Sequence, residues 1–588
     1  MTESNDIISF ESLFFCNENP PRKHQLMKSA KNRLPDRSVR IAVLSDSTVK
    51  EMTDFLTLFL RLKWIDCVLW IGDFNKIYED AVFRTEEIAS FQPDIILIHE
   101  TGRAMDAERF RSEFRQRYEA IWRKLELLNC QMIQTTIPLP AFRPLQNGDL
   151  TSHSGIVREI LQINLWLADQ AAQKPMMQML DLSYLSASTG LHQWYDDRLW
   201  YLYGCAYSQR VVPTVSYALA KLVLSLLGLR HKLLILDLDN TLWGGVWADD
   251  GPSGVLLGGE TAQGRAYRAF QQYLLQLKKN GMILAICSKN HMYSIRDCFD
   301  HPASILKWQD FAVVKVNWQP KSENIKQIVH ELNLSFDSAV FLDDNPAERM
   351  QVRREIPELW VPEFDKVENY TFLLQQGLIF DQQHITVEDR QRTQYYEGNK
   401  HRDDMKMMYS NRDAYLKDLG MKIYLVSPET YLDRIVQLIN KTNQFQITGK
   451  RSSEAAMLTY IQKHHVLAAR LVDIFGDNGI ISVMGISVQT DTAVIDYWVM
   501  SCRVFQRDVE LALLHYLTEQ LKQTAVKRIR ISYVQTPKNT MIGELLPKLG
   551  FCPVTQTDEG MLYEMELAQY SQNRKHFIEV YDDERVNS

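Results

Sequence analysis

Two carboxylates and a hydroxyl follow an apolar segment near the middle of the chain. Residues 233–236 are Leu-Leu-Ile-Leu, and Asp237, Asp239 and Thr241 come directly after them. The apolar run has the length of a buried strand, and ligands bind at the carboxyl ends of strands in open parallel sheets. Two acids one residue apart repel each other unless a proton or a cation lies between them. Because Mg²⁺ prefers oxygen ligands, the segment predicts a magnesium site.

Two more polar groups follow at the spacing that a phosphate site needs. Ser288 comes after the apolar strand 282–287 and is suited to donate a hydrogen bond to phosphate. Lys321 precedes a helical pattern and can place a positive charge on phosphate oxygens. Lys315 is a second candidate for that role, but it lies inside the predicted strand 313–316, where side chains alternate between the two faces.

The last cluster of the series is again acidic. Asp343 and Asp344 follow the strand 339–342, and we expect them to bind the metal together with Asp237 and Asp239. A turn with solvated acids after a core strand is the alternative for any one of these clusters, because short patterns recur by accident. Four such clusters in one βαβ series favour the catalytic interpretation.

The DxDxT pattern resembles the first motif of the haloacid dehalogenase (HAD) superfamily, whose usual chemistry is phosphoryl transfer. In such a site Asp237 is the nucleophile that forms an aspartyl-phosphate. Asp239 protonates the leaving oxygen and later activates water, while Thr241, Ser288 and Lys321 hold the phosphoryl oxygens. The intervals between the motifs leave room for one helix each and a flap around residues 243–257, so we expect a pocket without a cap domain.

Size and composition are those of an ordinary globular protein of several domains. The chain has 588 residues, 45% of them hydrophobic and 24% charged, which predicts three or four domains. A net charge of −7 without a long basic block argues against a nucleic-acid partner. The longest apolar stretch, 215–229, is interrupted by Lys221 and is too short to span a membrane. An acidic start and eight scattered cysteines predict a cytoplasmic protein with reduced thiols.

An independent α/β pattern precedes the HAD-like segment. Strands are predicted near 40–44, 66–71, 94–98 and 131–136, with a helix over 152–172. Ser47 stands where hydrolases of the SGNH type carry their nucleophile, but Ser45 replaces the usual glycine and no Asp-x-x-His pair follows. A serine without a base is a weak nucleophile, so we interpret this region as a docking or structural domain.

The region after the HAD-like segment resembles the GNAT acyltransferase fold. Strands over 494–500 and 529–533 flank a helix over 509–521, and Asn478-Gly479 predicts a hairpin turn. GNAT proteins bind a pyrophosphate with the amides of a glycine-bearing turn. Residues 504–508 contain no glycine, and Asp508 would oppose an anion. Conventional acetyl-CoA binding is therefore not expected, but Cys502, Arg503 and Arg507 are candidates for contact with a carrier protein or its pantetheine arm.

As a whole, the chain resembles the FkbH-like proteins of polyketide biosynthesis, which join an SGNH-like region, a capless HAD domain of subfamily IIIC and a GNAT-like region. The strings that carry this resemblance are 438–445 (LINKTNQF), 475–479 (FGDNG), 501–503 (SCR) and 536–539 (TPKN). Gln506 and Asp508 depart from the Gly-Arg-Gly usual in that loop. The resemblance implies an α/β chain with an extension (1–39), an SGNH-like domain (40–229), the HAD-like domain (230–366), a helical connector (367–417), the GNAT-like domain (418–568) and a polar tail (569–588).

The resemblance also implies a substrate and a partner. Family members take 1,3-bisphosphoglycerate, remove phosphate and load the glyceryl group as a thioester on the phosphopantetheine arm of an acyl carrier protein. Cys287 could accept the acyl group first or could simply pack in the core, and Cys502 is a second candidate acceptor. Two other functions stay open: a small-molecule phosphatase with partner-docking domains, and a docking module without chemistry. The sequence does not distinguish a glyceryl unit from a relative such as lactyl.

Overall fold

The computed structural model describes residues 23–582 apart from 32, 36, 105–106, 175, 260, 364–365, 379–397, 399–401, 403–404, 407, 443, 453, 537–538, 558–559 and 571–574. The first part of the predicted extension, much of the predicted connector and the end of the predicted tail lie outside these residues. The chain divides into two compact units, one up to Leu226 and one from Leu227 onward, and a short segment beginning at Leu373 belongs to the first unit.

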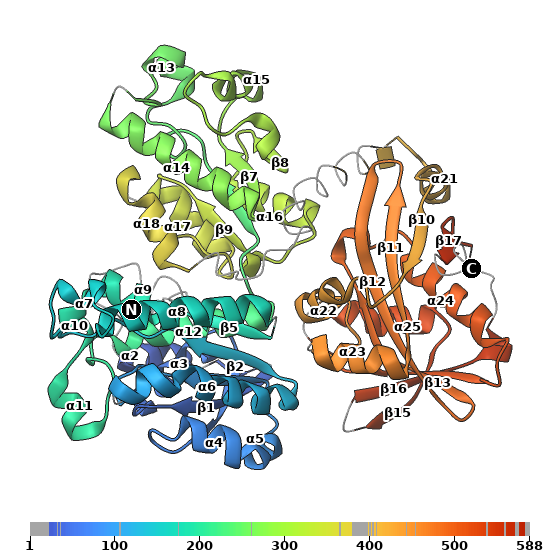
Figure 1. The fold of residues 1–588 in the computed structure, drawn as a ribbon. Coiled ribbons are helices and arrows are strands. Elements are labelled where there is room, and N and C mark those ends of the chain that lie inside the picture. The colour runs from blue at the N-terminus through green and yellow to red at the C-terminus, as the bar shows by residue number, and fades with distance from the viewer. Residues whose placement is uncertain are drawn as a thin grey trace. The chain divides into compact units, whose positions relative to one another are not determined.

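The first unit contains a five-stranded parallel sheet in the order β2-β1-β3-β4-β5 (Figure 1). Its strands are β1 (Arg37–Ser45), β2 (Ile65–Ile71), β3 (Ile95–His99), β4 (Gln131–Thr135) and β5 (Met177–Leu180). Its helices are α2 (Lys23–Ala30), α3 (Lys50–Arg61), α4 (Ile77–Phe83), α5 (Thr85–Phe91), α6 (Ala107–Leu125), α7 (Gly148–Thr151), α8 (Ile156–Gln173), α9 (Leu182–Thr189), α10 (Leu191–Trp194), α11 (Asp197–Tyr203) and α12 (Val212–Leu226).

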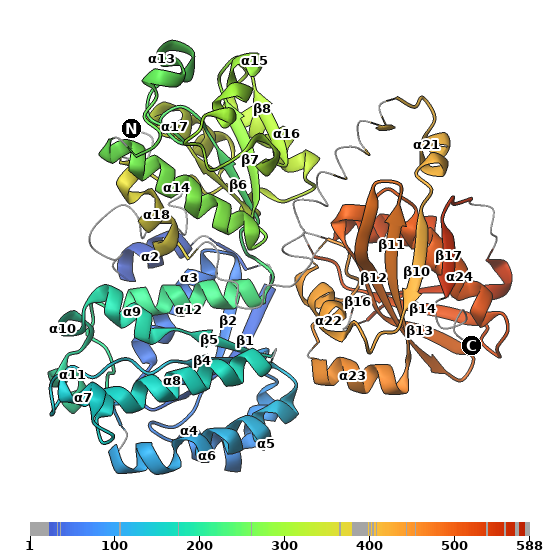
Figure 2. The same ribbon diagram turned by 45° about the horizontal axis from the view of Figure 1, so that its top comes forward.

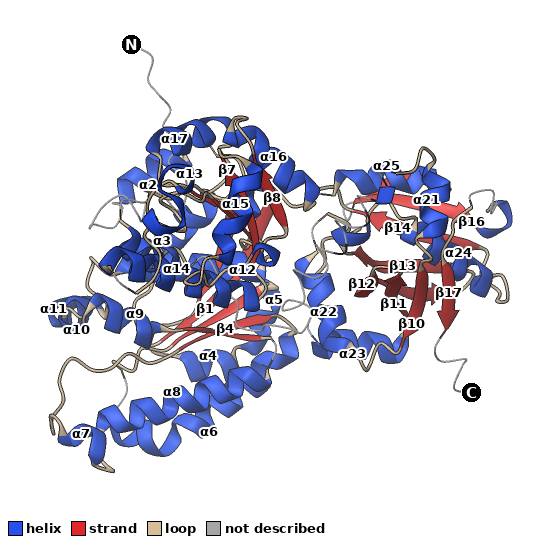
Figure 3. Cartoon of the chain, turned by 90° about the horizontal axis from the view of Figure 1, so that it is seen from above, coloured by secondary structure: helices blue, strands red, loops and turns tan. Residues whose placement is uncertain are grey.

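Helices cover both faces of this sheet, as the view in Figure 3 shows, with α6 and α8 on one side and α3 and α12 on the other. Parallel strands covered on both faces are apolar throughout, and β3 is buried along its whole length. The helix predicted over 152–172 begins at Ile156, because Gly155 before it has an extended backbone.

The second unit begins with a four-stranded parallel sheet in the order β8-β7-β6-β9. Its strands are β6 (Leu233–Leu236), β7 (Ile283–Ser288), β8 (Val313–Val316) and β9 (Ala339–Leu342). Its helices are α13 (Trp247–Gly254), α14 (Ala262–Lys279), α15 (Met292–Ile295), α16 (Lys321–Glu331), α17 (Pro346–Glu355) and α18 (Val367–Gln376). Side chains of α16 and α17 pack in one apolar cluster with the strands. All four predicted strands of this module are present.

The rest of the second unit is an eight-stranded mixed sheet in the order β15-β16-β14-β13-β12-β11-β10-β17. Its strands are β10 (Lys422–Val426), β11 (His465–Asp473), β12 (Gly476–Gln489), β13 (Thr492–Met500), β14 (Arg528–Tyr533), β15 (Cys552–Thr557), β16 (Gly560–Glu566) and β17 (Glu579–Asp582). Its helices are α21 (Arg412–Asp418), α22 (Leu432–Lys441), α23 (Glu454–Lys463), α24 (Val509–Leu521) and α25 (Thr540–Lys548). The core clusters place α22 and α23 on one face and α24 and α25 on the other, and Figure 2 shows the strands between α22 and α24.

The predicted hairpin exists, but its turn is not at Asn478-Gly479. The turn residues are Ile474 and Phe475, and Asn478-Gly479 lies inside β12. Gly479 has a φ of 65° opposite a register irregularity near Arg470 in β11. The positive φ of Gly479 therefore belongs to a β-bulge and not to the hairpin turn.

The fold class predicted from the sequence is confirmed: the chain is a multidomain α/β protein with parallel-sheet cores. No helix in the described part of the chain combines the length and the apolar character needed to cross a bilayer.

Candidate active site

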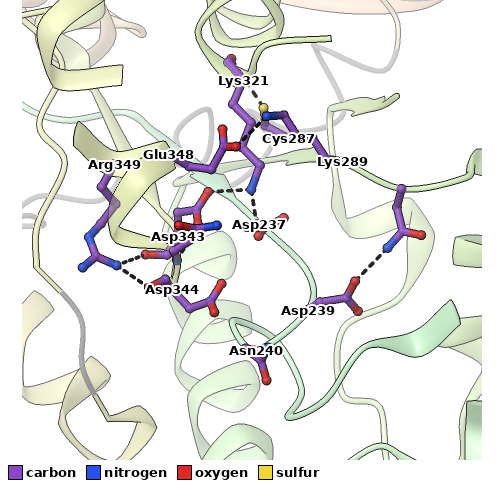
Figure 4. Close-up of polar contacts among 12 residues, drawn as sticks. Asp237, Asp239, Asn240, Cys287, Lys289, Lys321, Asp343, Asp344, Glu348 and Arg349 are labelled. Atoms are coloured by element: carbon purple, nitrogen blue, oxygen red, sulfur yellow. Dashed lines mark hydrogen bonds and ion pairs between the residues drawn. The ribbon is translucent and has the colours of Figure 1, made fainter. Parts of the chain in front are cut away.

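Polar residues from the ends of β6, β7 and β9 and from the start of α16 lie at one edge of the parallel sheet, and Figure 4 shows the contacts among the acids and Lys321. Asp237 follows β6, and its backbone N–H continues the ladder to the carbonyl of Leu342 on β9 at 2.9 Å. Asp343 and Asp344 follow β9, the direct neighbour of β6. The side-by-side pairing of these two strands brings acids that are more than a hundred residues apart in sequence to one place.

Three carboxylates form the acidic centre of the site. Oxygens of Asp237, Asp343 and Asp344 lie within 4.8 Å of one another. Asp237 and Asp343 are buried, and the Oδ1 atom of Asp237 has no hydrogen-bond partner. An orphaned carboxylate oxygen among buried acids is costly without a cation, and hard divalent cations take such oxygen ligands. The donor set therefore fits a divalent metal.

Lys321, at the first position of α16, lies against this centre. Its Nζ atom is 2.9 Å from Asp237 Oδ2 and 2.6 Å from Asp343 Oδ2, and the side chain is almost fully buried. Burial opposes the ammonium charge, but the two carboxylates outweigh it and raise the pKa of Lys321. Lys315, the other lysine considered, instead pairs with Glu331.

Burial and mutual repulsion destabilise the ionised carboxylates of the acidic centre. Burial, followed by repulsion from Asp237, raises the pKa of the Asp343 carboxyl. The same two causes, in the same order, raise the pKa of Asp344. Both shifts describe carboxylates that gain from a nearby cation, because a positive charge favours the ionised form.

Asp239 is oriented differently from the three other acids. Its Oδ1 accepts hydrogen bonds from the Trp243 indole and the Trp247 backbone, each at 2.9 Å. Its Oδ2 accepts from Asn290 Nδ2 at 2.8 Å. Figure 4 shows this carboxylate directed away from Asp343 and Asp344. Its side chain is not a member of the acidic cluster found among the described residues, and its position beside the cluster suits an acid–base role better than that of a fourth carboxylate ligand.

The two hydroxyls predicted to hold phosphate are buried at the same edge. Ser288 ends β7, and Thr241 lies in the turn after β6. Thr241 Oγ1 has no hydrogen-bond partner, so it can still donate to a ligand oxygen.

Cys287 is packed in the core. It is completely buried in the cluster that contains Ile325 and Phe341. Its thiol lies 3.7 Å from the carbonyl oxygen of Lys321, and burial raises the pKa of the thiol. Because the thiolate is the nucleophile, this environment fits the packing alternative better than the acyl-acceptor role.

Two residues of the site were missed by sequence reasoning. Arg349 of α17 donates from Nη1 to the carbonyl oxygens of Asp343 (2.7 Å) and Asp344 (2.6 Å), and Glu363 fixes its guanidinium at 2.8 Å. Asn290 holds Asp239, as described above. Pro346 at the start of α17 is a helix-start signal. It could have indicated that a side chain one turn later faces the loop of Asp343 and Asp344.

The loop before α24 has the backbone of a glycine turn without its glycines. Gln506 has a φ of 64° and Asp508 a φ of 60°, which are the two positions that depart from Gly-Arg-Gly. Asp508 is paired with Arg412 at 2.6 Å. Arg507 is buried and donates to the carbonyl of Arg503 at 2.8 Å. Arg507 is therefore not exposed as a contact for a carrier protein or its pantetheine arm.

In the first unit, the expectation that Ser47 has no histidine nearby is wrong. His99 Nδ1 lies 2.9 Å from Ser45 Oγ and 3.4 Å from Ser47 Oγ, and His99 Nε2 lies 2.5 Å from the Tyr207 hydroxyl. His99 stands at the end of β3, the neighbour of β1, which sequence spacing did not connect with Ser47. All four side chains are buried, and burial lowers the pKa of His99 to about 4.

The fold and this site define an α/β protein with a HAD-type core. No protein-family model matches the chain, and no curated protein matches it either. Among solved structures it is similar to the N-terminal part of the protein BF1531 from Bacteroides fragilis, which contains a phosphatase domain and was crystallised with Mg. The identity is 27% and the TM-score 0.57, over 61% of this chain and 98% of that one.

Two acetyltransferases are among the other similar structures. The ribosomal-protein-S18-alanine N-acetyltransferase from Escherichia coli is 16% identical with a TM-score of 0.20, over 26% of this chain and 99% of that one. A GNAT-family acetyltransferase from Staphylococcus aureus is 10% identical with a TM-score of 0.21, over 25% of this chain and 99% of that one.

Proposed function

We propose that this protein is a Mg²⁺-dependent phosphatase of the HAD type that prepares a three-carbon acyl unit for a carrier protein. One observation carries the phosphatase assignment: the buried Asp237 lies beside two further acids and Lys321. Its Oδ1 atom has no hydrogen-bond partner. The similarity to a phosphatase domain crystallised with Mg supports this assignment. Asp237, Asp343 and Asp344 would hold the ion, which neutralises phosphoryl charge when bound.

The residues around Asp237 supply the other parts of phosphoryl transfer. Asp237 attacks phosphorus, the bond from phosphorus to the ester oxygen breaks, and Asp239 gives that oxygen its proton. Water, deprotonated by Asp239, then cleaves the aspartyl-phosphate. The indole of Trp243 and the amide of Asn290 fix the direction of the Asp239 carboxylate. Lys321, Ser288 and Thr241 would hold the phosphoryl oxygens, because positioning and charge neutralisation dominate this chemistry.

The substrate we propose is 1,3-bisphosphoglycerate, and the acceptor is the phosphopantetheine thiol of an acyl carrier protein. The resemblance of the sequence to FkbH-like proteins supports both. The thiolate attacks the acyl carbon, the carbon–oxygen bond to phosphate breaks, and a phosphoglyceryl thioester and inorganic phosphate form. The phosphate ester at the other end is hydrolysed at Asp237. Between Asp237 and Ser288 the described chain adds the helices α13 and α14.

Intact-mass analysis of an acyl carrier protein tests this proposal. The carrier is incubated with the enzyme, Mg²⁺ and 1,3-bisphosphoglycerate, and the expected product is a glyceryl thioester without phosphate. Asp237→Asn should leave the terminal phosphate in place. Phosphate release without any carrier adduct would instead favour the small-molecule phosphatase. Loss of neither phosphate in the presence of Mg²⁺ would overturn the proposal.

A further inference from the structure

The segment that joins β8 to α16 carries a large exposed side chain beside the active site. It consists of residues 317–320, and Lys321, which contacts Asp237, follows it directly. Trp318 in this segment is 65% exposed. An indole three residues before the active-site lysine therefore lies in solvent at the same edge of the sheet.

Hydrogen bonds hold the backbone around Trp318 in place. The Asn317 N–H donates to the carbonyl oxygen of Ser288 at 3.2 Å, which ties the segment to the end of β7. The side chains of Asn317 and Asn324 exchange two hydrogen bonds, of 3.1 and 2.9 Å. The Gln319 N–H donates to Asn317 Oδ1 at 2.9 Å. Because the backbone on both sides of the indole is anchored, a ligand that covers Trp318 has little else to order.

A second exposed ring connects Trp318 with the acid of the reaction. The centroid of the His291 ring lies 5.5 Å from that of the Trp318 ring, in an edge-to-face arrangement. His291 is exposed and follows Asn290, whose side-chain amide bonds Asp239 at 2.8 Å. The next residue, Met292, is 44% exposed. We call Trp318, His291 and Met292 the rim.

The groups that hold Asp239 itself are not exposed. Trp243, Trp247 and Asn290 are buried. The ester oxygen that receives the Asp239 proton carries the rest of the substrate, and this part must extend from the site toward solvent. The rim adjoins Asn290 and Lys321 in the chain and is exposed, so it is the surface that this part of the substrate meets.

The chemistry of the rim selects among the possible substrates. A free three-carbon phosphate gives an indole and a thioether little to bind, because its hydroxyl, carboxylate and phosphate groups are polar. A pantetheine arm adds methylene groups, a dimethyl group and amides beyond the thioester. Apolar area that leaves water against Trp318 and Met292 favours binding of such a chain.

We propose that Trp318 is a specificity-determining residue, whose indole contacts the pantetheine arm when the phosphoglyceryl unit is carried on it as a thioester. His291 supports the indole at its edge. The inference rests on the proposed function, since it names the form in which that site takes its substrate. The phosphate is then removed after the acyl unit has reached the arm.

Two thioesters of phosphoglyceric acid test the proposal, one with pantetheine and one with ethanethiol. They share the phosphate and the thioester and differ only in the arm. For phosphate release with Mg²⁺, wild type should show a higher kcat/KM with the pantetheine thioester. Trp318→Ala should lower this value about tenfold, chiefly through KM, because a contact to a remote part of the substrate is lost. It should change kcat/KM for the ethyl thioester less than twofold, and Trp318→Phe should retain part of the preference.

Phe372→Ala is the matched control. Phe372 is an exposed ring of α18, outside the loops that follow the strands of the parallel sheet, and its loss should leave the preference for the pantetheine thioester unchanged. Equal effects of Trp318→Ala on both thioesters, or no effect on either, would overturn the inference and leave the phosphatase assignment intact. No phosphate release from either thioester by wild type would overturn the proposed function and this inference with it.

Contact with the arm is measured directly in Asp237→Asn protein labelled with fluorotryptophan, because turnover is blocked there. The fluorine resonance of Trp318, assigned with Trp318→Phe, should shift in a saturable manner with the pantetheine thioester and stay in place with the ethyl thioester. An equal shift with both compounds, or no shift with the pantetheine thioester, would contradict the contact.

Discussion

Arg349 Nη1 lies 2.7 Å from the carbonyl oxygen of Asp343. The buried guanidinium therefore fixes the backbone of residues 343–344, the metal loop, without contacting the side-chain carboxylate of either residue. The same atom also bonds the carbonyl of Asp344 at 2.6 Å. Outer groups that orient metal ligands commonly affect metal affinity. This relationship leads to the first prediction.

Arg349→Lys should weaken Mg²⁺ binding by about tenfold, because an ammonium group does not reproduce the planar fork that reaches both carbonyls and Glu363. Titration calorimetry of the variant with Mg²⁺ measures this directly. Arg354→Lys is the control, because Arg354 is on the same helix and is exposed to solvent. Equal Mg²⁺ affinities of the two variants would contradict the role assigned to Arg349.

Asp237→Asn should abolish phosphate release, because an amide is a poor nucleophile and no longer carries the charge that faces Lys321. Asp343→Asn should mainly raise the Mg²⁺ concentration needed for half-maximal rate. Phosphate release assayed over a range of Mg²⁺ separates the two effects. Asp300→Asn, at an exposed position of the same module, should behave like the wild type. Undiminished release from Asp237→Asn, or from wild type in excess chelator, would refute the assignment.

Cys287→Ala should still load the carrier at a substantial rate, because the thiol is packed in the core and its pKa is raised by burial. The lost volume should cost about 1 kcal/mol of stability. Mass analysis of the enzyme incubated without carrier should show no acyl adduct labile to hydroxylamine. Cys298→Ala, another buried cysteine, is the matched control. If Cys287→Ala alone lost loading while both variants stayed folded, a covalent relay through Cys287 would be required.

The first unit should become less stable as the pH falls from about 6.5 to about 4, the interval between the ordinary and the folded pKa of His99. Because the folded pKa is lowered, the unfolded chain binds a proton in this interval that the folded chain does not, and protonation therefore favours unfolding. Between pH 7 and pH 5 the difference is about 2 kcal/mol.

Hydrogen exchange of the β1 and β3 amides in wild type and His99→Gln measures this contribution, because the amide of Gln keeps hydrogen bonding but does not titrate. Comparison of the two proteins at each pH removes the intrinsic pH dependence of exchange. The same pH dependence in both proteins would show that His99 does not contribute.

The sequence by itself determined the strands and the order of the catalytic groups. Short apolar runs predicted β6, β7, β8 and β9, and a polar residue directly after each run must lie at the edge where parallel strands end. Asp237, Ser288 and Asp343 could therefore be named from their places after the strands, and Lys321 from its place at the start of the helical pattern that follows β8. These features are local, because the length and burial of a strand are encoded in consecutive residues.

Only the tertiary structure decided where the side chains point and what they contact. The direction of Asp239 depends on Asn290, which is 51 residues away, and the bond from Arg349 depends on how α17 folds back on β9. The proximity of His99 to Ser47 arises from the pairing of β1 with β3. The left-handed backbone at Gln506 and Asp508 arises without the glycines that predict it. Such contacts join residues distant in sequence, and packing, not local propensity, selects them.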